Sequence, residues 1–252
     1  MRYLGIAPVK PKVAVFDFTS CEGCELQLVN KEATLGPFLK SIDIVRFREA
    51  SSAAGDDFEV AIVEGAITRA DEVERLQRIR GQAKVLVAFG SCACFGGVAR
   101  LKNAYDLAEA NREVYGDKPK ATELARPLQD FVTVDMSIPG CPVAKDEVER
   151  VVRHVALGVP FEFTVYPVCV ECKQRFVSCV MEHDQLCLGP ITRAGCEAPC
   201  PAGGLGCWGC RGPAPDANLP EFLVLARARG FSEKEIDERL SFFGGFEGLR
   251  CA

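Results

Sequence analysis

The 252-residue sequence lacks the marks of several large protein classes. No apolar run reaches the roughly 20 residues that a membrane-spanning helix needs. The start, MRYLGIAPVKPKVAVF, has neither a basic segment followed by a long apolar run nor a twin-arginine pair. The net charge is −5, and Lys and Arg are not clustered as nucleic-acid surfaces require. We therefore expect a cytoplasmic protein with no membrane span and no nucleic-acid partner.

Cysteine, in contrast, is abundant, with 14 residues in the chain. In a reducing compartment, cysteines at short spacing hold metal more often than they form disulfides. Eight of them fall between Cys169 and Cys210, in a region rich in Gly and Pro where we expect little regular structure. Because its apolar content alone is too small to hold this region together, we expect metal centres to stabilise it. The composition changes at HVALGVPFEFTVYP, which predicts domains 1–160 and 161–252.

The first domain alternates between apolar strands and helices. The expected strands are KVAVFDF (12–18), IDIVRF (42–47), FEVAIVEG (58–65), KVLVAFG (84–90) and FVTVDMSIPG (131–140). Expected helices cover 22–36, ending at Gly36; 68–82, with Thr68 as the capping residue and an end at a glycine; and 143–158. Continuous apolar strands joined by helices indicate a parallel sheet covered on both faces. The prediction is a flavodoxin-like or Rossmann-like α/β domain, followed by a cysteine-rich irregular domain with a short helix in the tail 232–249.

Polar and sulfur-bearing side chains follow the predicted strands. Cys21 and Cys24 come after the first, Glu64 ends the third, Cys92 follows the fourth and Cys141 follows the fifth. Because the carboxyl ends of parallel strands meet at one edge of a sheet, these residues should converge there. The sequence therefore predicts a four-cysteine site assembled from three loops.

Four thiolates suit zinc or an iron–sulfur cluster. Structural zinc sites usually draw two CxxC knuckles from a compact local fold, whereas these four cysteines are spread over about 120 residues. The glycines in CEGC, GSCACFGG and IPGCP let backbone N–H groups approach cluster sulfurs. Iron–sulfur is favoured over zinc. GSCACFGG also looks like a phosphate loop, but no GK[ST] follows it.

CEGC after the first strand, GSCACFGG after the fourth and PGCP after the fifth resemble the proximal-cluster signature of the small subunits of nickel–iron hydrogenases. The twenty-kilodalton subunit of NADH:quinone oxidoreductase has a similar signature without the long cysteine-rich extension. The region PVCVECKQRFVSCVMEHDQLCLGPITRAGCEAPCPAGGLGCWGCRG resembles the electron-relay domain of the cytoplasmic group. Within that group, FDFTSCEGCELQLVN followed by VEGAITR most resembles the delta subunits of the bidirectional hydrogenases, also called sulfhydrogenases.

The resemblance implies three [4Fe-4S] clusters, whose ligand sets we name the proximal, distal and medial groups. They are Cys21, Cys24, Cys92 and Cys141 (proximal), Cys169, Cys172, Cys179 and Cys187 (distal), and Cys196, Cys200, Cys207 and Cys210 (medial). Cys187 and Cys196 could exchange groups. Cys200 supplies the fourth ligand that three-iron medial clusters lack. Oxygen-tolerant relatives carry two more cysteines, and here those positions are Gly23 and Gly97.

The remaining candidates receive no ligand role. Cys94 is expected to be a small buried residue and Cys251 a free thiol near the end of the chain. For Glu25 and Glu64, proton relay, surface solvation and a salt bridge across an interface all stay open.

The resemblance implies an electron-transfer small subunit that relays electrons between the Ni–Fe site of a large subunit and a flavin/NAD(P)-reducing module, within a heterotetramer. The Ni–Fe centre and FAD would belong to partner subunits, which would include further iron–sulfur subunits, and this chain would have no catalytic residue of its own. Alternatives are the small subunit of a heterodisulfide-reductase-linked or viologen-reducing hydrogenase and, more distantly, a zinc-stabilised non-redox assembly subunit.

Overall fold

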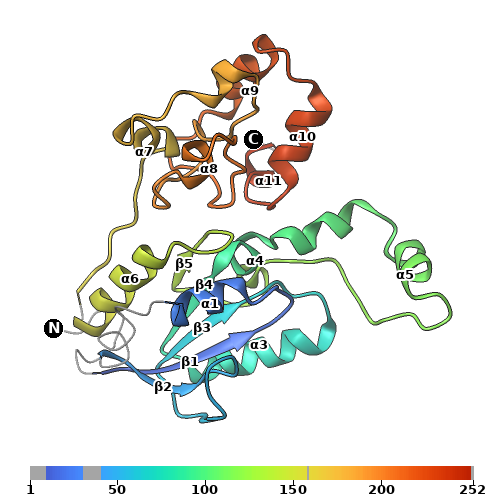
Figure 1. Cartoon of the computed structure of the whole chain (residues 1–252). Helices are drawn as coiled ribbons and strands as arrows, with labels where there is room; N and C mark the ends of the chain where they lie inside the picture. The colour runs from blue at the N-terminus through green and yellow to red at the C-terminus, as the bar shows by residue number, and fades with distance from the viewer. Residues whose placement is uncertain (1–9, 31–40, 158, 251–252) are drawn as a thin grey trace. The chain divides into compact units, whose positions relative to one another are not determined.

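The computed structural model describes residues 10–30, 41–157 and 159–250. The chain divides into two compact units, Met1–Phe161 and Glu162–Ala252 (Figure 1). No helix in the described ranges is both long and apolar enough to cross a membrane.

The first unit is built on a five-stranded parallel sheet with the strand order β2-β1-β3-β4-β5. The strands are β1 (Lys12–Asp17), β2 (Asp43–Arg46), β3 (Val60–Glu64), β4 (Val85–Phe89) and β5 (Met136–Ile138). All four neighbouring pairs are parallel. This is the flavodoxin-like order. The prediction of a flavodoxin-like parallel sheet is confirmed.

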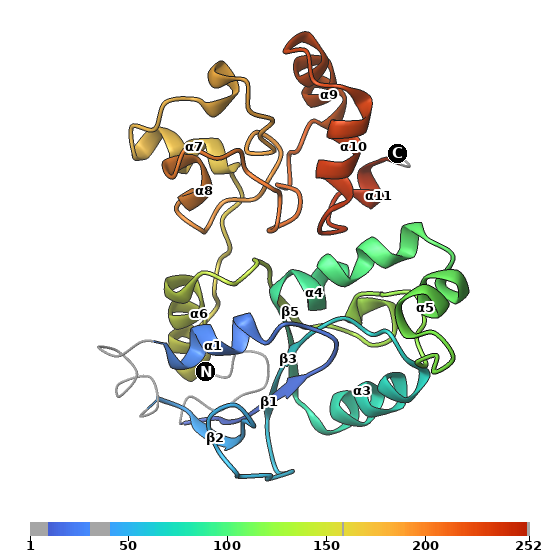
Figure 2. The same cartoon turned by 45° about the vertical axis from the view of Figure 1, so that its right-hand side comes forward.

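Helices cover both faces of this sheet (Figure 2). In β1, β3 and β4 successive side chains point to opposite faces. Ala14, Ala61 and Leu86 pack in one core with Leu76 and Ile79 of α3 (Ala70–Gln82). On the other face, side chains of α6 (Lys145–Leu157) line a small apolar cavity together with side chains of the four strands β1, β3, β4 and β5. The near-continuous apolar strands therefore follow from burial on both sides.

Two of the expected helix boundaries differ from the structure. The first helix, α1, runs over Gly23–Val29 with Asn30 as its C-cap, and the expected end at Gly36 lies outside the described residues. The N-cap of α3 is Arg69 instead of Thr68, and the helix continues through Gly81 to Gln82. The Thr68 hydroxyl lies 2.7 Å from that of Thr19, so it joins two loops and does not cap the helix.

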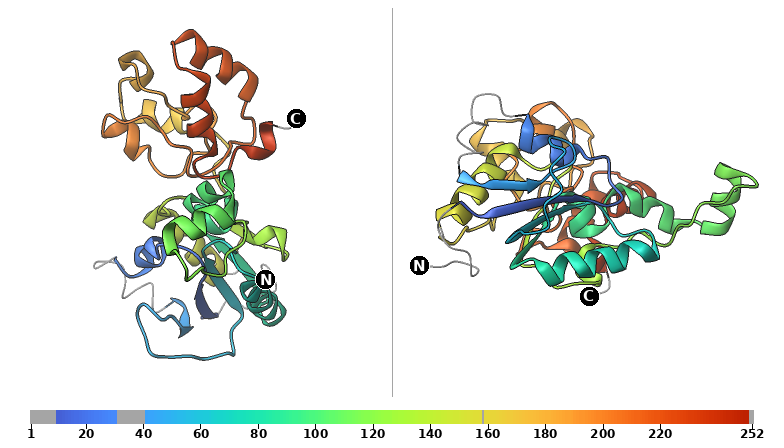
Figure 3. Two further views of the ribbon diagram at one scale, coloured as in Figure 1. Left: turned by 90° about the vertical axis from the view of Figure 1, so that its right-hand side faces the viewer. Right: turned by 90° about the horizontal axis from the view of Figure 1, so that it is seen from below.

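Residues 90–130 form short helices that the sequence pattern did not indicate. They are α4 (Gly90–Phe95), the 3-10 helix η1 (Val98–Ala104), α5 (Leu107–Tyr115) and the 3-10 helix η2 (Leu128–Asp130). Neither η1 nor α5 has a buried residue, and Figure 3 shows α5 extending away from the sheet. Tyr105 and Val114 are 69% and 70% exposed. This arm leaves large apolar side chains in solvent.

The second unit contains helices and loops but no strand among its described residues. Its helices are α7 (Val168–Gln174), η3 (Val180–His183), α8 (Pro199–Ala202), α9 (Leu219–Ala228), α10 (Glu233–Ser241) and α11 (Glu247–Arg250). A capping box of Ser232 and Glu235 starts α10, as expected for a tail helix. Ile236 and Leu240 pack with Phe222 of α9, a helix that the composition did not predict. Cys251 lies outside the described residues.

Candidate functional site

The proximal group gathers at the carboxyl edge of the sheet. Cys21 lies in the loop after β1, Cys24 in the first turn of α1, Cys92 in α4 after β4, and Cys141 after β5. Figure 2 shows α1 and α4 at the same end of the sheet. Burial, followed by the charges of Cys92, Cys21 and Glu64, raises the pKa of Cys141 to about 11. Burial also raises the pKa of Cys24, as do Glu64, Cys141 and Cys92. The four thiols are thus close enough to act on one another electrostatically.

Glycines allow the backbone to approach these sulfurs closely. A Cβ added at Gly90 would lie 2.5 Å from the Sγ of Cys24, and one at Gly97 would lie 2.5 Å from the Sγ of Cys92. Both glycines have positive φ, at 86° and 59°. Backbone N–H groups of Val143 and Val98 donate to the thiols of Cys24 and Cys92 and lower their pKa values, although burial outweighs this effect. The group therefore combines four sulfurs with amide donors aimed at two of them.

Glu64 fixes the start of α1 beside this group. It ends β3 at the centre of the sheet and is 1% exposed. Its carboxylate accepts from the backbone N–H of Glu25 at 2.8 Å and from that of Cys24 at 3.3 Å. Burial raises the pKa of Glu64, and these amide donors lower it in part. Surface solvation, one of the three roles left open, is wrong for Glu64.

Glu25 is also buried, at 2% exposure, so surface solvation is wrong for it too. Its Oε1 has no hydrogen-bond partner among the described residues. Burial, followed by the charges of Glu64 and Asp17, raises the pKa of Glu25 to about 8.

The distal group lies on α7 and the following loop. Burial raises the pKa of Cys169 to about 12, with Cys187, Cys172 and Cys179 as the next contributors. A Cβ at Gly189 would lie 3.3 Å from the Sγ of Cys187 and 3.4 Å from that of Cys169, so these two sulfurs flank one glycine. The backbone N–H of Cys207 donates to the Cys187 Sγ at 3.1 Å. Cys187 therefore stands with Cys169, Cys172 and Cys179.

The medial group occupies the loop and short helix that follow. Burial, followed by the charges of Glu171 and Cys210, raises the pKa of Cys196 to about 12. Cys207 is deeply buried, which raises its pKa, and both Cys187 and Cys210 contribute. Cys200 lies in α8. Cys196, Cys207 and Cys210 thus share one neighbourhood, and Cys207 also borders the distal group.

Two buried charged residues that the sequence pattern did not single out contact this region. Glu171 lies on α7 between Cys169 and Cys172, and its Oε1 accepts from the Gly195 N–H at 2.7 Å. Its Oε2 lies 3.9 Å from the Cys196 Sγ. Arg211 is 1% exposed, and its Nε donates to the Ala194 carbonyl at 2.9 Å. The sequence could have indicated both residues, because Glu171 lies between Cys169 and Cys172 and Arg211 directly follows Cys210.

Cys94, as expected, is buried at 4% exposure, and its thiol donates to the Ala88 carbonyl at 3.6 Å. No disulfide joins the described cysteines. Within residues 10–30, 41–157 and 159–250, no three His, Cys, Asp or Glu side chains form a group suited to a single metal ion.

The chain is similar in sequence to known redox proteins. Residues 21–155 match the family described as NADH ubiquinone oxidoreductase, 20 Kd subunit. The chain is 39% identical over 236 residues to the sulfhydrogenase 2 subunit delta of Pyrococcus furiosus, covering 92% of this chain and 98% of the relative. It is 27% identical to a vhu subunit of the F420-non-reducing hydrogenase of Methanocaldococcus jannaschii, covering 93% of this chain and 94% of the relative.

The fold is also that of solved hydrogenase chains. A chain in the crystal structure of an NAD+-reducing [NiFe]-hydrogenase in the H2-reduced state superposes with a TM-score of 0.56 at 22% identity, covering 61% of this chain and 95% of that one. The resemblance predicted from CEGC, GSCACFGG and PGCP is confirmed. The chain belongs to the family of the 20 Kd subunit of NADH ubiquinone oxidoreductase and is related over almost its whole length to hydrogenase small subunits.

Proposed function

We propose that this chain is the electron-transfer small subunit of a [NiFe] hydrogenase and binds three [4Fe-4S] clusters. The observation that carries the proposal is the arrangement of eleven cysteines in three neighbourhoods, with Cys200 on α8 between Cys196 and Cys207 in the chain, in a protein of this family. Bound clusters would supply reversible one-electron redox chemistry. The chain would work in the cytoplasm.

The donor chemistry fits iron–sulfur clusters. Each group offers thiols whose pKa values are raised mainly by burial, because a buried thiolate without a counter-charge is costly. Iron would remove this cost, since it replaces the thiol proton and supplies the positive charge. Backbone N–H groups donate to Cys24, Cys92, Cys187, Cys196 and Cys207. Such N–H···S bonds and the local burial are the means by which a protein sets cluster potentials.

The geometry supports the division by order of the chain. The sulfurs of Cys187 and Cys169 both lie within 3.4 Å of the position of a Cβ at Gly189, which favours Cys187 as a distal ligand. Cys210, a medial thiol, contributes to the raised pKa of Cys196, which favours Cys196 as a medial ligand. Both observations speak against an exchange of Cys187 and Cys196.

We propose a large subunit carrying Ni–Fe as the partner at the proximal group. Cys21 and Cys141 are exposed, and Cys92 lies in α4, directly before the arm formed by η1 and α5. The arm leaves Tyr105, Val114 and Tyr115 exposed and buries no side chain of its own helices. Large exposed apolar side chains of this kind are typical of interaction sites.

For the second partner we propose a flavin-containing module that exchanges electrons with NAD(P), as the resemblance to the delta subunits of sulfhydrogenases implies. The relative at 39% identity carries that name. The competing candidate is a complex that reduces other acceptors. It is supported by the 27% identity to a subunit of an F420-non-reducing hydrogenase.

Metal analysis of the anaerobically purified chain tests the cluster assignment. We expect about twelve iron atoms and no nickel per chain, since three four-iron clusters are proposed. About four iron atoms would refute the two clusters of the second unit, and stoichiometric zinc would refute a redox role. Co-purification with a nickel-containing subunit tests the partner.

A further inference from the structure

The turn that ends α7 contains an aromatic residue at a position where glycine is usual. The backbone N–H of Val177 bonds to the Cys172 carbonyl at 3.0 Å, and that of Phe176 bonds to the Lys173 carbonyl at 3.1 Å. These two bonds define a Schellman motif, in which the residue after the C-cap adopts a left-handed conformation and is usually glycine. Here that residue is Phe176, with φ of 55°. A side chain with a Cβ costs free energy at this position.

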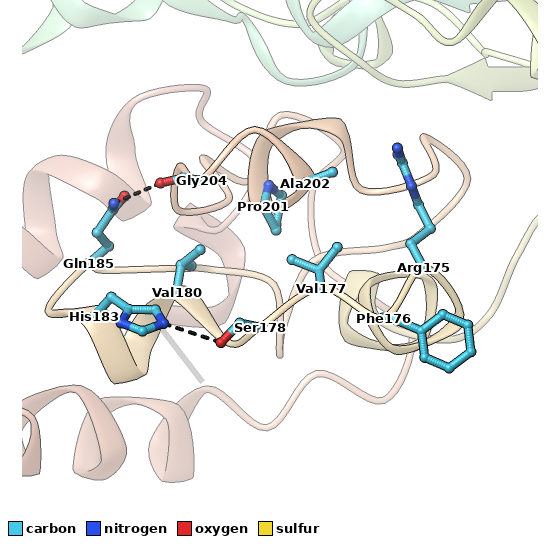
Figure 4. A pocket seen from close by; sticks show the side chains of 10 residues that line it. All are labelled: Arg175, Phe176, Val177, Ser178, Val180, His183, Gln185, Pro201, Ala202 and Gly204. Carbon is cyan, nitrogen blue, oxygen red and sulfur yellow. Dashed lines mark hydrogen bonds between the residues drawn. The ribbon is translucent and has the colours of Figure 1, made fainter.

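Burial against the described residues does not compensate this cost. Phe176 is 96% exposed, the highest value among the exposed large apolar residues. In Figure 4 its ring points away from the other labelled side chains. Glycine would serve the turn better and would avoid placing an aromatic ring in water. We infer that the gain from the ring comes from contact with another molecule.

The surroundings define what that molecule meets. Phe176 stands at one end of a cavity of about 580 Å³ between residues 175–185 and α8 (Figure 4). Lys173 and Arg175, both exposed, lie close to Phe176 in the chain, while the exposed acids Glu182 and Asp184 lie on η3 and just beyond it. A partner protein that covers this surface would offer an apolar pocket for the Phe176 ring and carboxylates that pair with Lys173 and Arg175.

The position relative to the cysteines identifies the kind of partner. Cys172 supplies the carbonyl that closes the turn, and Cys179 follows Phe176 by three residues. Any protein that buries the Phe176 ring therefore covers the chain segment that carries Cys172 and Cys179 of the distal group. Electron transfer requires such closeness between cofactors, whereas a purely structural partner does not.

Building on the proposed function, we propose that Phe176 anchors the docking surface for the electron-exchanging redox subunit, the flavin-containing module. Aromatic residues that enter a partner's pocket commonly dominate binding. The strained turn presents the ring in a fixed direction and so lowers the entropy lost on association.

The test uses the complex purified anaerobically from its host through a tag on the large subunit. Phe176→Gly removes the ring and relieves the turn, and Phe176→Asn is a second variant that tolerates a left-handed conformation. Val224→Ala on α9, 57% exposed in the same unit, is the matched control. Binding of the purified flavin subunit to the large–small pair is measured by titration, alongside flavin content, iron content and H2-dependent viologen reduction.

We expect both Phe176 variants to bind the flavin subunit at least tenfold more weakly, with iron content and viologen reduction unchanged and a thermal midpoint equal to or above that of the wild type. The control should bind normally. Unchanged affinity would overturn the inference, as would a lowered midpoint, which would assign Phe176 a structural role. The inference would also be overturned if the Phe176 variants kept their affinity for the flavin subunit and instead lost a dimer of this chain or the contact between its two units. Failure of the proposed function is distinguishable, because the wild type would then lack iron or H2-dependent activity.

Discussion

Replacement of Glu171 is expected to disturb two cysteine groups at once. The residue is 7% exposed and sits on α7 between distal cysteines, while its carboxylate accepts from Gly195 beside the medial Cys196. In Glu171→Ala the buried Gly195 N–H loses its acceptor, which costs about 1–3 kcal/mol. The loss of one buried methylene group adds about 0.8 kcal/mol. A total of about 2–4 kcal/mol corresponds to a fall of roughly 4–16 °C in the thermal midpoint of a chain this size.

Glu171→Gln separates the hydrogen bond from the charge. Glutamine keeps an acceptor oxygen and the volume of the side chain, so we expect a loss of only about 1 kcal/mol, the difference between charged and neutral hydrogen bonds. Glu221→Ala, an exposed glutamate on α9, should stay within about 0.5 kcal/mol of the wild type.

The assay is anaerobic thermal unfolding of the cluster-loaded chain at one fixed scan rate, combined with paramagnetic resonance of the reduced clusters. We expect Glu171→Ala to change the spectra attributed to both the medial and the distal site. Equal destabilisation by the Ala and Gln variants would refute a role based on the hydrogen bond to Gly195, and a change confined to one site would refute the link between the groups.

Three further predictions concern the other cysteine sites. Cys200→Pro should leave the medial site with three thiolates and give a three-iron signal in the oxidised protein, whereas an unchanged four-iron spectrum would show that Cys200 is not a ligand. Gly97→Ala should destabilise the chain by more than about 2 kcal/mol, because the new Cβ would clash with the Sγ of Cys92 and the residue has a positive φ. Gly81→Ala, inside α3 with open space around it, should stabilise the chain by about 0.5–1 kcal/mol. Unfolding midpoints of the two variants that do not move in opposite directions would contradict this. Because Gly23 and Gly97 offer no extra thiolates, the complex should lose activity in air, and a redox titration should show a single one-electron transition at the proximal cluster; two successive oxidations would be inconsistent with four-thiolate ligation.

Much of the first unit could be predicted from local patterns. The apolar strands at 12–18, 58–65 and 84–90 are continuous because the sheet is buried on both faces, and parallel pairing then brings their carboxyl ends together. Cys21, Cys24, Cys92 and Cys141 converge for that reason, and their spacing in the sequence already implied it. The helix boundaries were less accessible. Thr68 is a good capping residue by type, but its hydroxyl pairs with Thr19, a contact between segments that no local pattern contains.

The sequence by itself determined the α/β class, the family motifs and the number of cysteines available for metal, because these depend on periodicity and on residue type. Only the tertiary structure decided the burial of Glu25 and Glu64, the reach of Glu171 to Gly195, and the exposure of Phe176. Those properties arise from contacts between residues distant in the chain. A carboxylate or an aromatic ring has the same local preferences whether it faces solvent or protein, so its environment appears only when the chain is folded.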